Sequence, residues 1–257
     1  MIESLVIYIA PEIKEPDRGF ALNLKQALDL ESTSDNEPSD SKRAVFEYAD
    51  GILCLHLLLD NKPTSLSFDF DDGEVGYRAR RVSKSNELVA RALGVKPNYR
   101  PKVLDATAGM GRDSLIMAML GCNVVMYERQ VAIHALLANA LERFKLSGHN
   151  QQVAERLFLA QNDSKEFVKG AEGFDVIYLD PMFPERKKSA LVKKEMRLFK
   201  MLAGEDKDAD ELLLGALQSP VPRIVVKRPK GAPVLANKKP SHEIVAKKFR
   251  YDVYLNS

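Results

Sequence analysis

The pattern of apolar and polar residues changes near residue 80 of this chain. Before that point, residues 52–59 and 65–70 are rich in apolar side chains and flank the turn-like residues 60–63, which predicts a β-hairpin. Residues 32–41 show no apolar periodicity and include Asn36, Pro38 and several acidic residues, so we expect a flexible loop there. Residues 1–80 are therefore expected to form a small, β-rich N-terminal α+β domain.

From residue 81 to residue 257, short apolar strands alternate with stretches of helical periodicity. The predicted strands cover residues 102–106, 123–127, 157–160, 175–179 and 223–226. The predicted helices cover residues 86–93, 113–120, 131–146, 164–169, 195–202 and 212–217, and residues 242–255 are expected to add a closing antiparallel pair. This alternation predicts an α/β domain whose parallel sheet is covered on both faces.

The composition is that of a globular protein. Of 257 residues, 45% are hydrophobic and 29% are charged, which excludes a disordered or fibrous chain. The longest apolar stretches, residues 5–10 and 52–59, are far shorter than the roughly 20 residues of a membrane-spanning helix. The N-terminus lacks the early basic residues of a secretory signal, and two cysteines cannot form a disulfide framework. We therefore expect a cytoplasmic protein without a membrane partner.

Charge is distributed unevenly, although the formal net charge is only +2. Residues 1–80 include 16 acidic and 8 basic residues, whereas residues 181–200 include 7 basic and 2 acidic residues. Residues 221–257 include 9 basic and 2 acidic residues. This asymmetry indicates a polyanionic partner; the alternative is a surface of solvated lysines.

A glycine-containing segment follows the predicted strand at 102–106. Asp105 lies at the strand end, and Gly109 and Gly111 precede the next helix, at the place where open α/β sheets bind ligands. Ser114 stands where a dinucleotide site would have its third glycine. Asp105 would repel a pyrophosphate but attract the ammonium group of an amino acid, and S-adenosylmethionine carries such a group. The alternative is an ordinary glycine-rich turn.

Two further carboxylates follow the next two strands. Glu128 comes at the end of the strand at 123–127, where an acidic residue can accept hydrogen bonds from both hydroxyls of a ribose. Asp163 follows the strand at 157–160 and is a candidate acceptor for an adenine amino group. Its alternative role is to cap the next helix, at whose start Ser164 is also a capping candidate.

An acid, a proline and an aromatic residue, Asp180, Pro181 and Phe183, follow the apolar strand at 175–179. The carboxylate of Asp180 and a nearby backbone carbonyl can accept both N–H groups of an exocyclic amine, while Phe183 stacks on the planar base. Methyl transfer from a sulfonium has a good leaving group, so positioning contributes most of the catalysis and no strong general base is required. These three residues are the catalytic candidates; the alternative is a proline-containing turn with a core phenylalanine.

Basic residues are concentrated after this loop and after the strand at 223–226. On the strand-end side of the sheet they would neutralise the phosphates of a nucleic acid. The candidate RNA-binding residues are Arg186, Lys187, Lys188, Lys193, Lys194, Arg197, Lys227 and Arg228. No metal site is expected, because Cys54 and His56 offer only two ligands on one strand.

Three strings of the sequence resemble a known family. VLDATAGMGRDS, YLDPMFPERKKSALVKKEMR and VVKRP are similar to the bacterial ribosomal RNA small subunit methyltransferase J family, over about residues 83–254. The resemblance implies a class I S-adenosylmethionine-dependent methyltransferase domain at residues 81–257, with a Rossmann-like, seven-stranded sheet. It implies methylation of the N2 amine of a guanosine, with 16S rRNA or the small ribosomal subunit as partner.

The cofactor contacts implied by the resemblance fall on Arg112, Asp113, Glu128, Arg129, Asp163, Ser164 and Asp180. The wider amino-methyltransferase pattern has a second proline where this chain has Met182, so the carbonyl that receives the amine stays open.

The residues by themselves leave other functions open. One is an amino-methyltransferase with a different acceptor, such as adenine in DNA or a glutamine side chain. Another is a non-catalytic RNA-binding protein on the same fold, against which the joint presence of Asp105, Glu128 and Asp180 argues. The guanosine comes from the resemblance alone, and both free 16S rRNA and an assembled subunit remain candidate substrates.

Overall fold

The computed structural model describes residues 2–71, 88–182, 194–204 and 208–256. The chain forms two compact units, each assembled from separate stretches of sequence. The first combines Met1–Asp69, Gln130–Arg143 and Pro184–Gly204, and the second combines Phe70–Arg129, Phe144–Phe183 and Glu205–Ser257. The domain boundary predicted at residue 80 lies outside the described residues and stays a prediction.

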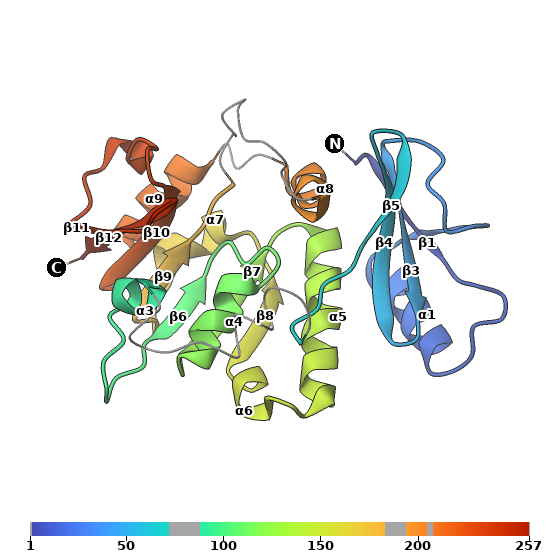
Figure 1. The fold of residues 1–257 in the computed structure, drawn as a ribbon, viewed down its shortest axis with the longest axis horizontal. Coiled ribbons are helices and arrows are strands. Elements are labelled where there is room, and N and C mark those ends of the chain that lie inside the picture. The colour runs from blue at the N-terminus through green and yellow to red at the C-terminus, as the bar shows by residue number, and fades with distance from the viewer. Residues whose placement is uncertain (1, 72–87, 183–193, 205–207, 257) are drawn as a thin grey trace. The chain divides into compact units, whose positions relative to one another are not determined.

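A five-stranded sheet of order β2-β1-β3-β4-β5 forms the core of the first unit (Figure 1). Strand β1 (Ser4–Tyr8) runs parallel to β2 (Glu31–Thr33) and β3 (Arg43–Ala49), and β4 (Ile52–Leu59) and β5 (Lys62–Leu66) continue the sheet in antiparallel fashion. In β4 every second residue is buried, because successive side chains of a strand point to opposite faces. These buried residues are Leu53, Leu55, Leu57 and Leu59.

The predicted hairpin is confirmed, with a tighter turn than expected. Only Asp60 and Asn61 separate β4 from β5, and both have positive φ angles, 52° and 58°. Asp and Asn tolerate the left-handed conformation that a two-residue hairpin turn requires, so the second strand begins at Lys62. Pro63 is tolerated because β5 is an edge strand. In the segment expected to be a loop, residues 32 and 33 belong to the short strand β2.

Helices from three parts of the chain complete the first unit. In α1 (Asp17–Ala27), Phe20 stacks on Tyr48 of β3 with ring centroids 4.0 Å apart. In the N-terminal part of α5 (Val131–Ser147), Asn139 accepts a hydrogen bond from the Leu53 backbone N–H at 2.9 Å. Helix α8 (Lys194–Ala203) carries Phe199, whose ring lies against that of Phe68. Segments far apart in sequence thus share one core.

The second unit contains a seven-stranded sheet of order β11-β12-β10-β9-β6-β7-β8. The strands are β6 (Lys102–Asp105), β7 (Asn123–Glu128), β8 (Leu157–Gln161), β9 (Val176–Leu179), β10 (Arg223–Pro229), β11 (His242–Val245) and β12 (Phe249–Leu255). Strands β8, β7, β6, β9 and β10 are parallel, and β12 is antiparallel to both of its neighbours. The predicted parallel sheet with a closing antiparallel pair is confirmed.

Both faces of this sheet are covered. Leu104, Ile177 and Val226 pack in one core with residues of α9 (Ala209–Gln218), and the alternate residues Val103 and Val225 are also fully buried on the opposite face. The remaining helices are α3 (Leu88–Leu93), α4 (Arg112–Met119), α6 (Gln151–Ala154) and α7 (Ser164–Phe167), with 3-10 turns at Val168–Gly170 and Leu235–Asn237. None of the described helices is both long enough and apolar enough to cross a membrane.

The strand order reverses between β6 and β9. From β6 the chain proceeds outward to β7 and β8, and it then returns to the other side of β6 to form β9 and β10. In open α/β sheets, ligands bind at the carboxyl ends of the strands at such a reversal. The fold therefore directs the search for a site to the residues that follow β6 and β9.

Candidate active site

Four carboxylates lie at the ends of four adjacent parallel strands. Asp105 ends β6 and Glu128 ends β7, while Asp163 follows β8 and Asp180 follows β9. Because the carboxyl ends of parallel strands lie at one edge of a sheet, the fold carries all four residues to the same edge. These are the acidic residues that the sequence singled out.

Asp105 holds the glycine-containing turn together. Its Oδ1 accepts a hydrogen bond from the Thr107 N–H at 3.1 Å, and its Oδ2 accepts one from the Ser114 hydroxyl at 2.5 Å. The residue is only 2% exposed. Burial raises the pKa of Asp105 to about 7, although both hydrogen bonds act to lower it. The sequence predicts that Asp105 attracts an ammonium group. Because the carboxyl group is buried beneath the turn, it would do so from there and not as an exposed carboxylate.

The turn itself depends on two glycines. Gly109 and Gly111 have φ angles of 54° and 70°, in the left-handed region that side chains disfavour, and α4 begins directly after them at Arg112. Glu128 Oε2 accepts a hydrogen bond from the Gly109 N–H at 3.0 Å. The carboxylate proposed to bind a ribose is thus tied to the loop proposed to bind the methionine part.

Arg129, an implied cofactor contact, binds a second carboxylate. It donates a hydrogen bond to Asp208 Oδ2 at 2.7 Å. Burial by itself would raise the pKa of Asp208, but the bound guanidinium outweighs this effect and lowers it. Asp208 lies just before α9, so this ion pair connects the end of β7 to that helix.

Asp163 is a helix cap in this structure. Its Oδ1 accepts the Lys165 backbone N–H at 3.0 Å at the start of α7. Ser164 is buried, and its hydroxyl donates to the carbonyl oxygen of Ala106 at 2.6 Å, which joins α7 to the end of β6. The capping role that the sequence offered as an alternative is present, and the contact with adenine stays a prediction.

Asp180 is the centre of a charged network. Its backbone N–H donates to Thr107 Oγ1 at 2.6 Å, and its Oδ2 accepts from Lys227 Nζ at 2.8 Å. The same ammonium group donates to Asp113 Oδ2 at 2.6 Å, which also accepts the Tyr178 hydroxyl at 2.6 Å. The Asp180 side chain is 38% exposed, so its carboxylate faces the strand-end edge and not the protein interior.

Lys227 and Arg228 require a correction, because β10 extends to Pro229 and both residues lie within the strand. Burial opposes the charged form of Lys227, yet the carboxylates of Asp180 and Asp113 raise its pKa above the ordinary value. Arg228 is 4% exposed and donates to the carbonyl oxygen of Pro233. A guanidinium in that position offers almost no surface to RNA, so Arg228 is removed from the candidate interface.

The sequence did not identify the contacts of Thr107, Tyr178 and Lys227. Tyr178 is buried within β9, and burial and the charge of Asp113 raise its pKa well above the ordinary value. One signal was available: Lys227 directly follows the apolar residues 224–226 of β10. Its meaning depends on the pairing of β10 with β9, which sequence alone does not give.

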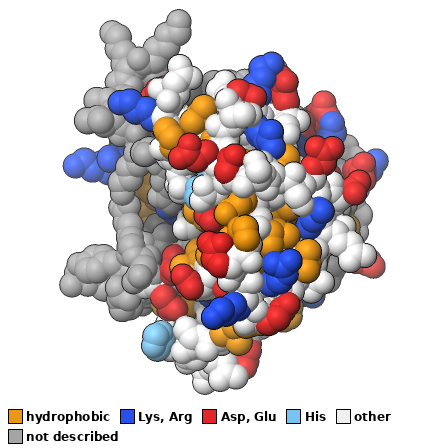
Figure 2. Space-filling view, turned by 90° about the vertical axis from the view of Figure 1, so that its right-hand side faces the viewer, with side chains coloured by type: hydrophobic (Ala, Val, Ile, Leu, Met, Phe, Trp, Pro, Cys, Tyr) orange, Lys and Arg blue, Asp and Glu red, His pale blue; other side chains and the backbone are white. Residues whose placement is uncertain are grey.

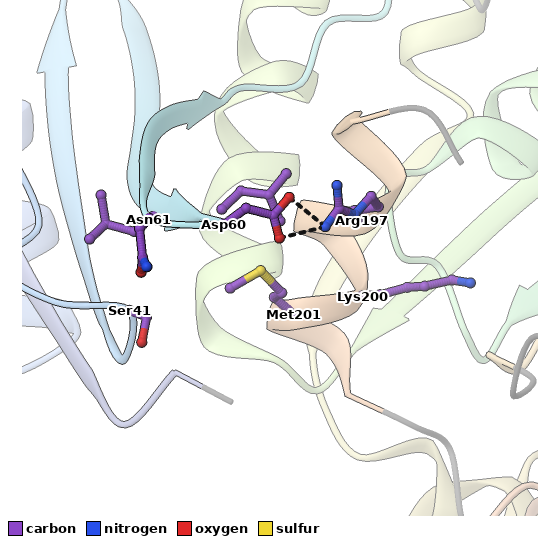
Figure 3. Close-up of a pocket in the computed structure, with 8 residues that line it drawn as sticks. Ser41, Asp60, Asn61, Arg197, Lys200 and Met201 are labelled. Atoms are coloured by element: carbon purple, nitrogen blue, oxygen red, sulfur yellow. Dashed lines mark hydrogen bonds and ion pairs between the residues drawn. The ribbon is translucent and has the colours of Figure 1, made fainter. Parts of the chain in front are cut away.

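Most other predicted contact residues lie outside the described part of the chain. These are Phe183, Arg186, Lys187, Lys188 and Lys193, while Lys194 begins α8. Arg197 is described and binds both carboxylate oxygens of Asp60 at 2.8 Å (Figure 3). The two residues line a pocket of about 450 Å³ in the first unit, with Lys200 and Met201 on the same helix.

The described surface gives two further constraints. On the face shown in Figure 2, acidic and basic side chains lie intermixed with apolar ones, so that face offers a polyanion no continuous basic patch among the residues described. No cluster of three or more His, Cys, Asp or Glu side chains suited to a metal ion occurs within the described ranges. His56, one of the two candidate ligands, instead contacts Glu47 and Ser65.

Comparison with known proteins identifies related chains. A protein-family model described as "Putative SAM-dependent methyltransferase" matches residues 24–256. Ribosomal RNA small subunit methyltransferase J of Desulfotalea psychrophila is 39% identical over 261 residues, which cover 100% of this chain and 99% of that protein. The protein of the same name from Thioalkalivibrio sulfidiphilus is 46% identical over 206 residues, which cover 79% of this chain and 81% of that protein.

A solved structure is similar over almost the whole chain. The crystal structure of a SAM-dependent methyltransferase from Neisseria gonorrhoeae has a TM-score of 0.74 and 30% sequence identity. The match covers 98% of this chain and 96% of that one, so it includes both units.

Proposed function

The chain belongs to the family of Ribosomal RNA small subunit methyltransferase J, and we propose that it methylates the N2 amine of a guanosine in 16S rRNA. Family membership and the class I S-adenosylmethionine-dependent methyltransferase fold, both implied by the sequence, are confirmed. S-adenosylmethionine is the methyl donor of this family. The rRNA substrate is carried over from the names of the relatives, and the N2 amine rests on the family resemblance.

One observation carries the proposal from the structure: Asp180 follows β9 at the reversal of strand order, with its backbone N–H bound to Thr107 and its partly exposed carboxylate bound to Lys227. A carboxylate accepts hydrogen bonds only, so it suits an amine that donates two. Held in this way, Asp180 can orient the nucleophilic nitrogen for an in-line displacement. Pro181 is buried directly after it and restricts the backbone there.

The residues of the edge suit the methyl donor, which supplies an electrophilic methyl group on a positively charged sulfur when bound. Gly109 and Gly111 allow close approach of a ligand to the backbone, since a side chain at either position would strain the turn. Glu128 offers a carboxylate next to that turn for the ribose hydroxyls. Asp113 and Asp180 share a single ammonium group, so the pair leaves net negative charge at the edge where a cation would bind.

Asp180 has a limited chemical task. It holds the amine by accepting one N–H group, while a nearby backbone carbonyl accepts the other, and the extra proton of the methylated nitrogen passes to water after the transfer. Because the leaving group is good, orientation within the site supplies most of the rate enhancement. We assign base stacking to Phe183 and phosphate contacts to the basic segment that follows it, with Lys200 on α8 extending that segment. Arg197 on the same helix would have to exchange its ion pair with Asp60 for a phosphate.

The direct test is to map 16S rRNA modifications by mass spectrometry in cells with and without this protein. We expect one N2-methylguanosine to disappear in its absence and to return when the purified protein and labelled S-adenosylmethionine are added. Addition to free 16S rRNA and to small subunits, in parallel, identifies the substrate. An unchanged modification map, or label that enters DNA or protein instead, would reject the rRNA assignment. A calorimetric titration without S-adenosylmethionine binding would favour a non-catalytic RNA-binding protein.

A further inference from the structure

We propose that Lys227 is a positioning residue for methyl transfer: its ammonium group, bridging Asp180 and Asp113, holds the Asp180 carboxylate toward the target amine. This inference rests on the proposed function. It also replaces the role that the sequence suggested for Lys227, a phosphate contact at the protein surface.

Lys227 forms a bridge between two carboxylates. Lys227 Nζ lies 2.8 Å from Asp180 Oδ2 and 2.6 Å from Asp113 Oδ2. The Tyr178 hydroxyl donates to the same oxygen of Asp113 at 2.6 Å. The bridge therefore links strand β10, helix α4 and the loop after β9, and it gives the Asp180 side chain a fixed partner at one oxygen.

The fold confines the Lys227 side chain. Lys227 lies opposite Tyr251 in the pairing of β10 with β12, and its ammonium is 5.9 Å from the centre of the Phe249 ring. Tyr251 contacts the rings of both Phe249 and Tyr178, with centroids 5.3 and 6.3 Å apart. These aromatic rings limit the space around the methylene groups of Lys227, and its side chain is only 25% exposed. A lysine that contacts phosphate at the protein surface would instead extend into solvent.

Lys227 also offsets the repulsion between two carboxylates. Asp113 and Asp180 lie within reach of one ammonium group, and both charges also act on the buried Asp105. Without a cation between them, Asp113 and Asp180 would repel each other, and the Asp180 side chain would turn away. The side chains of Asp113 and Lys227 are only 17% and 25% exposed, so losing the cation costs more here than at a fully exposed ion pair. Lys227 therefore keeps the Asp180 carboxylate oriented.

The test compares Lys227→Met and Lys227→Arg in the full-length protein, with Lys239→Met, at an exposed lysine, as the matched control. Steady-state methyl transfer is measured with labelled S-adenosylmethionine and small ribosomal subunits from cells lacking the protein. Positioning predicts that Lys227→Met lowers kcat about 100-fold while KM for the subunit changes less than about threefold. Lys227→Arg should recover at least about tenfold of the lost kcat, because it restores a cation that can bind two carboxylates.

Several outcomes would overturn the inference. A normal kcat for Lys227→Met would do so, as would a raised KM with unchanged kcat, since that is the behaviour of a phosphate contact. If Lys227→Met gives no cooperative melting transition, Lys227→Gln is measured instead, because it keeps a hydrogen-bond donor without the charge. An unchanged kcat for Lys227→Gln would also refute the positioning role. Asp180→Ala in the same assay separates the two proposals, because its normal turnover would reject the site itself. If methyl transfer is lost in Asp180→Ala but normal in Lys227→Met, only the role proposed for Lys227 is rejected.

Discussion

Glu128 accepts a hydrogen bond from the backbone N–H of Gly109 at 3.0 Å, although the two residues are 19 positions apart in the chain. The bond joins the end of β7 to the turn after β6, so one carboxylate shapes the turn and adjoins the place where a ribose would bind. Two functions of the edge, loop conformation and ligand binding, therefore depend on the same side chain.

This relationship predicts that Glu128→Ala binds S-adenosylmethionine about 10-fold to 100-fold more weakly. The variant loses charged hydrogen bonds to a ribose, for which we take a net loss of about 1.5–3 kcal/mol in total, and loosens the turn at Gly109. Isothermal titration calorimetry measures the change, with Glu172→Ala, at an exposed position, as the control. Equal affinities for the two variants would contradict the assignment of Glu128.

Asp180→Ala should separate binding from chemistry. We expect affinity for S-adenosylmethionine to stay within about threefold of wild type, while methyl transfer falls at least about 100-fold because the amine is no longer oriented. Lys227 keeps Asp113 as a partner in this variant, so the fold should persist. Single-turnover assays with bound donor measure the effect, and normal turnover would remove Asp180 from the site.

Asp163 can be tested for a role beyond capping. Serine caps helices about as well as aspartate but is too short to reach an adenine, so Asp163→Ser should keep the melting temperature yet weaken S-adenosylmethionine binding. Asp163→Ala should lose both, with a capping cost of about 1 kcal/mol. Calorimetry and thermal melting distinguish the roles. If Asp163→Ser binds the donor like wild type, Asp163 is a cap alone.

Asp105 should make stability depend on pH. Burial raises its pKa to about 7, whereas an unfolded aspartate has a pKa of about 3.9. Between about pH 4 and pH 7 the folded protein therefore holds a proton that the unfolded chain has released. The resulting stabilisation is complete below about pH 4 and is lost as pH rises to about 7, at about 1.4 kcal/mol per pH unit.

The comparison of wild type with Asp105→Asn isolates this effect. Thermal melting from pH 5 to pH 8 should show the stability of wild type relative to the variant falling with pH and levelling off above about pH 7. Parallel curves across that range would show that Asp105 does not titrate there.

RNA binding should weaken steeply with salt. Each neutralised phosphate contributes a slope of about −0.7 to −0.9 in a plot of log affinity against log salt concentration. Replacing Lys187 and Lys188 by alanine should reduce the magnitude of the slope by the contribution of about two phosphates, whereas Lys239→Met should leave the slope unchanged. Filter binding of 16S rRNA between about 50 and 200 mM salt measures it. A flat response would remove the phosphate contacts from the proposal.

The sequence alone determined the features that depend on short stretches of chain. Apolar runs bounded by turn or capping residues such as Gly94 and Gly111 predicted the strands and helices of the second unit. Burial favours apolar residues in an element whichever other element packs against it. Asp105, Glu128, Asp163 and Asp180 were identified for a similar reason. A residue after a predicted parallel strand must lie at the carboxyl edge of the sheet.

Which of these groups meet depends on the tertiary structure. Pairing of β10 with β9 and β12 extends the strand to Pro229, buries Arg228 and places Lys227 against Asp180, which a basic run in sequence does not predict. The joining of residues 130–143 and 194–204 to the unit of the N-terminal sheet likewise depends on long-range contacts. Such contacts depend on strand order and register, and these arise from the packing of the whole chain, not from any local pattern.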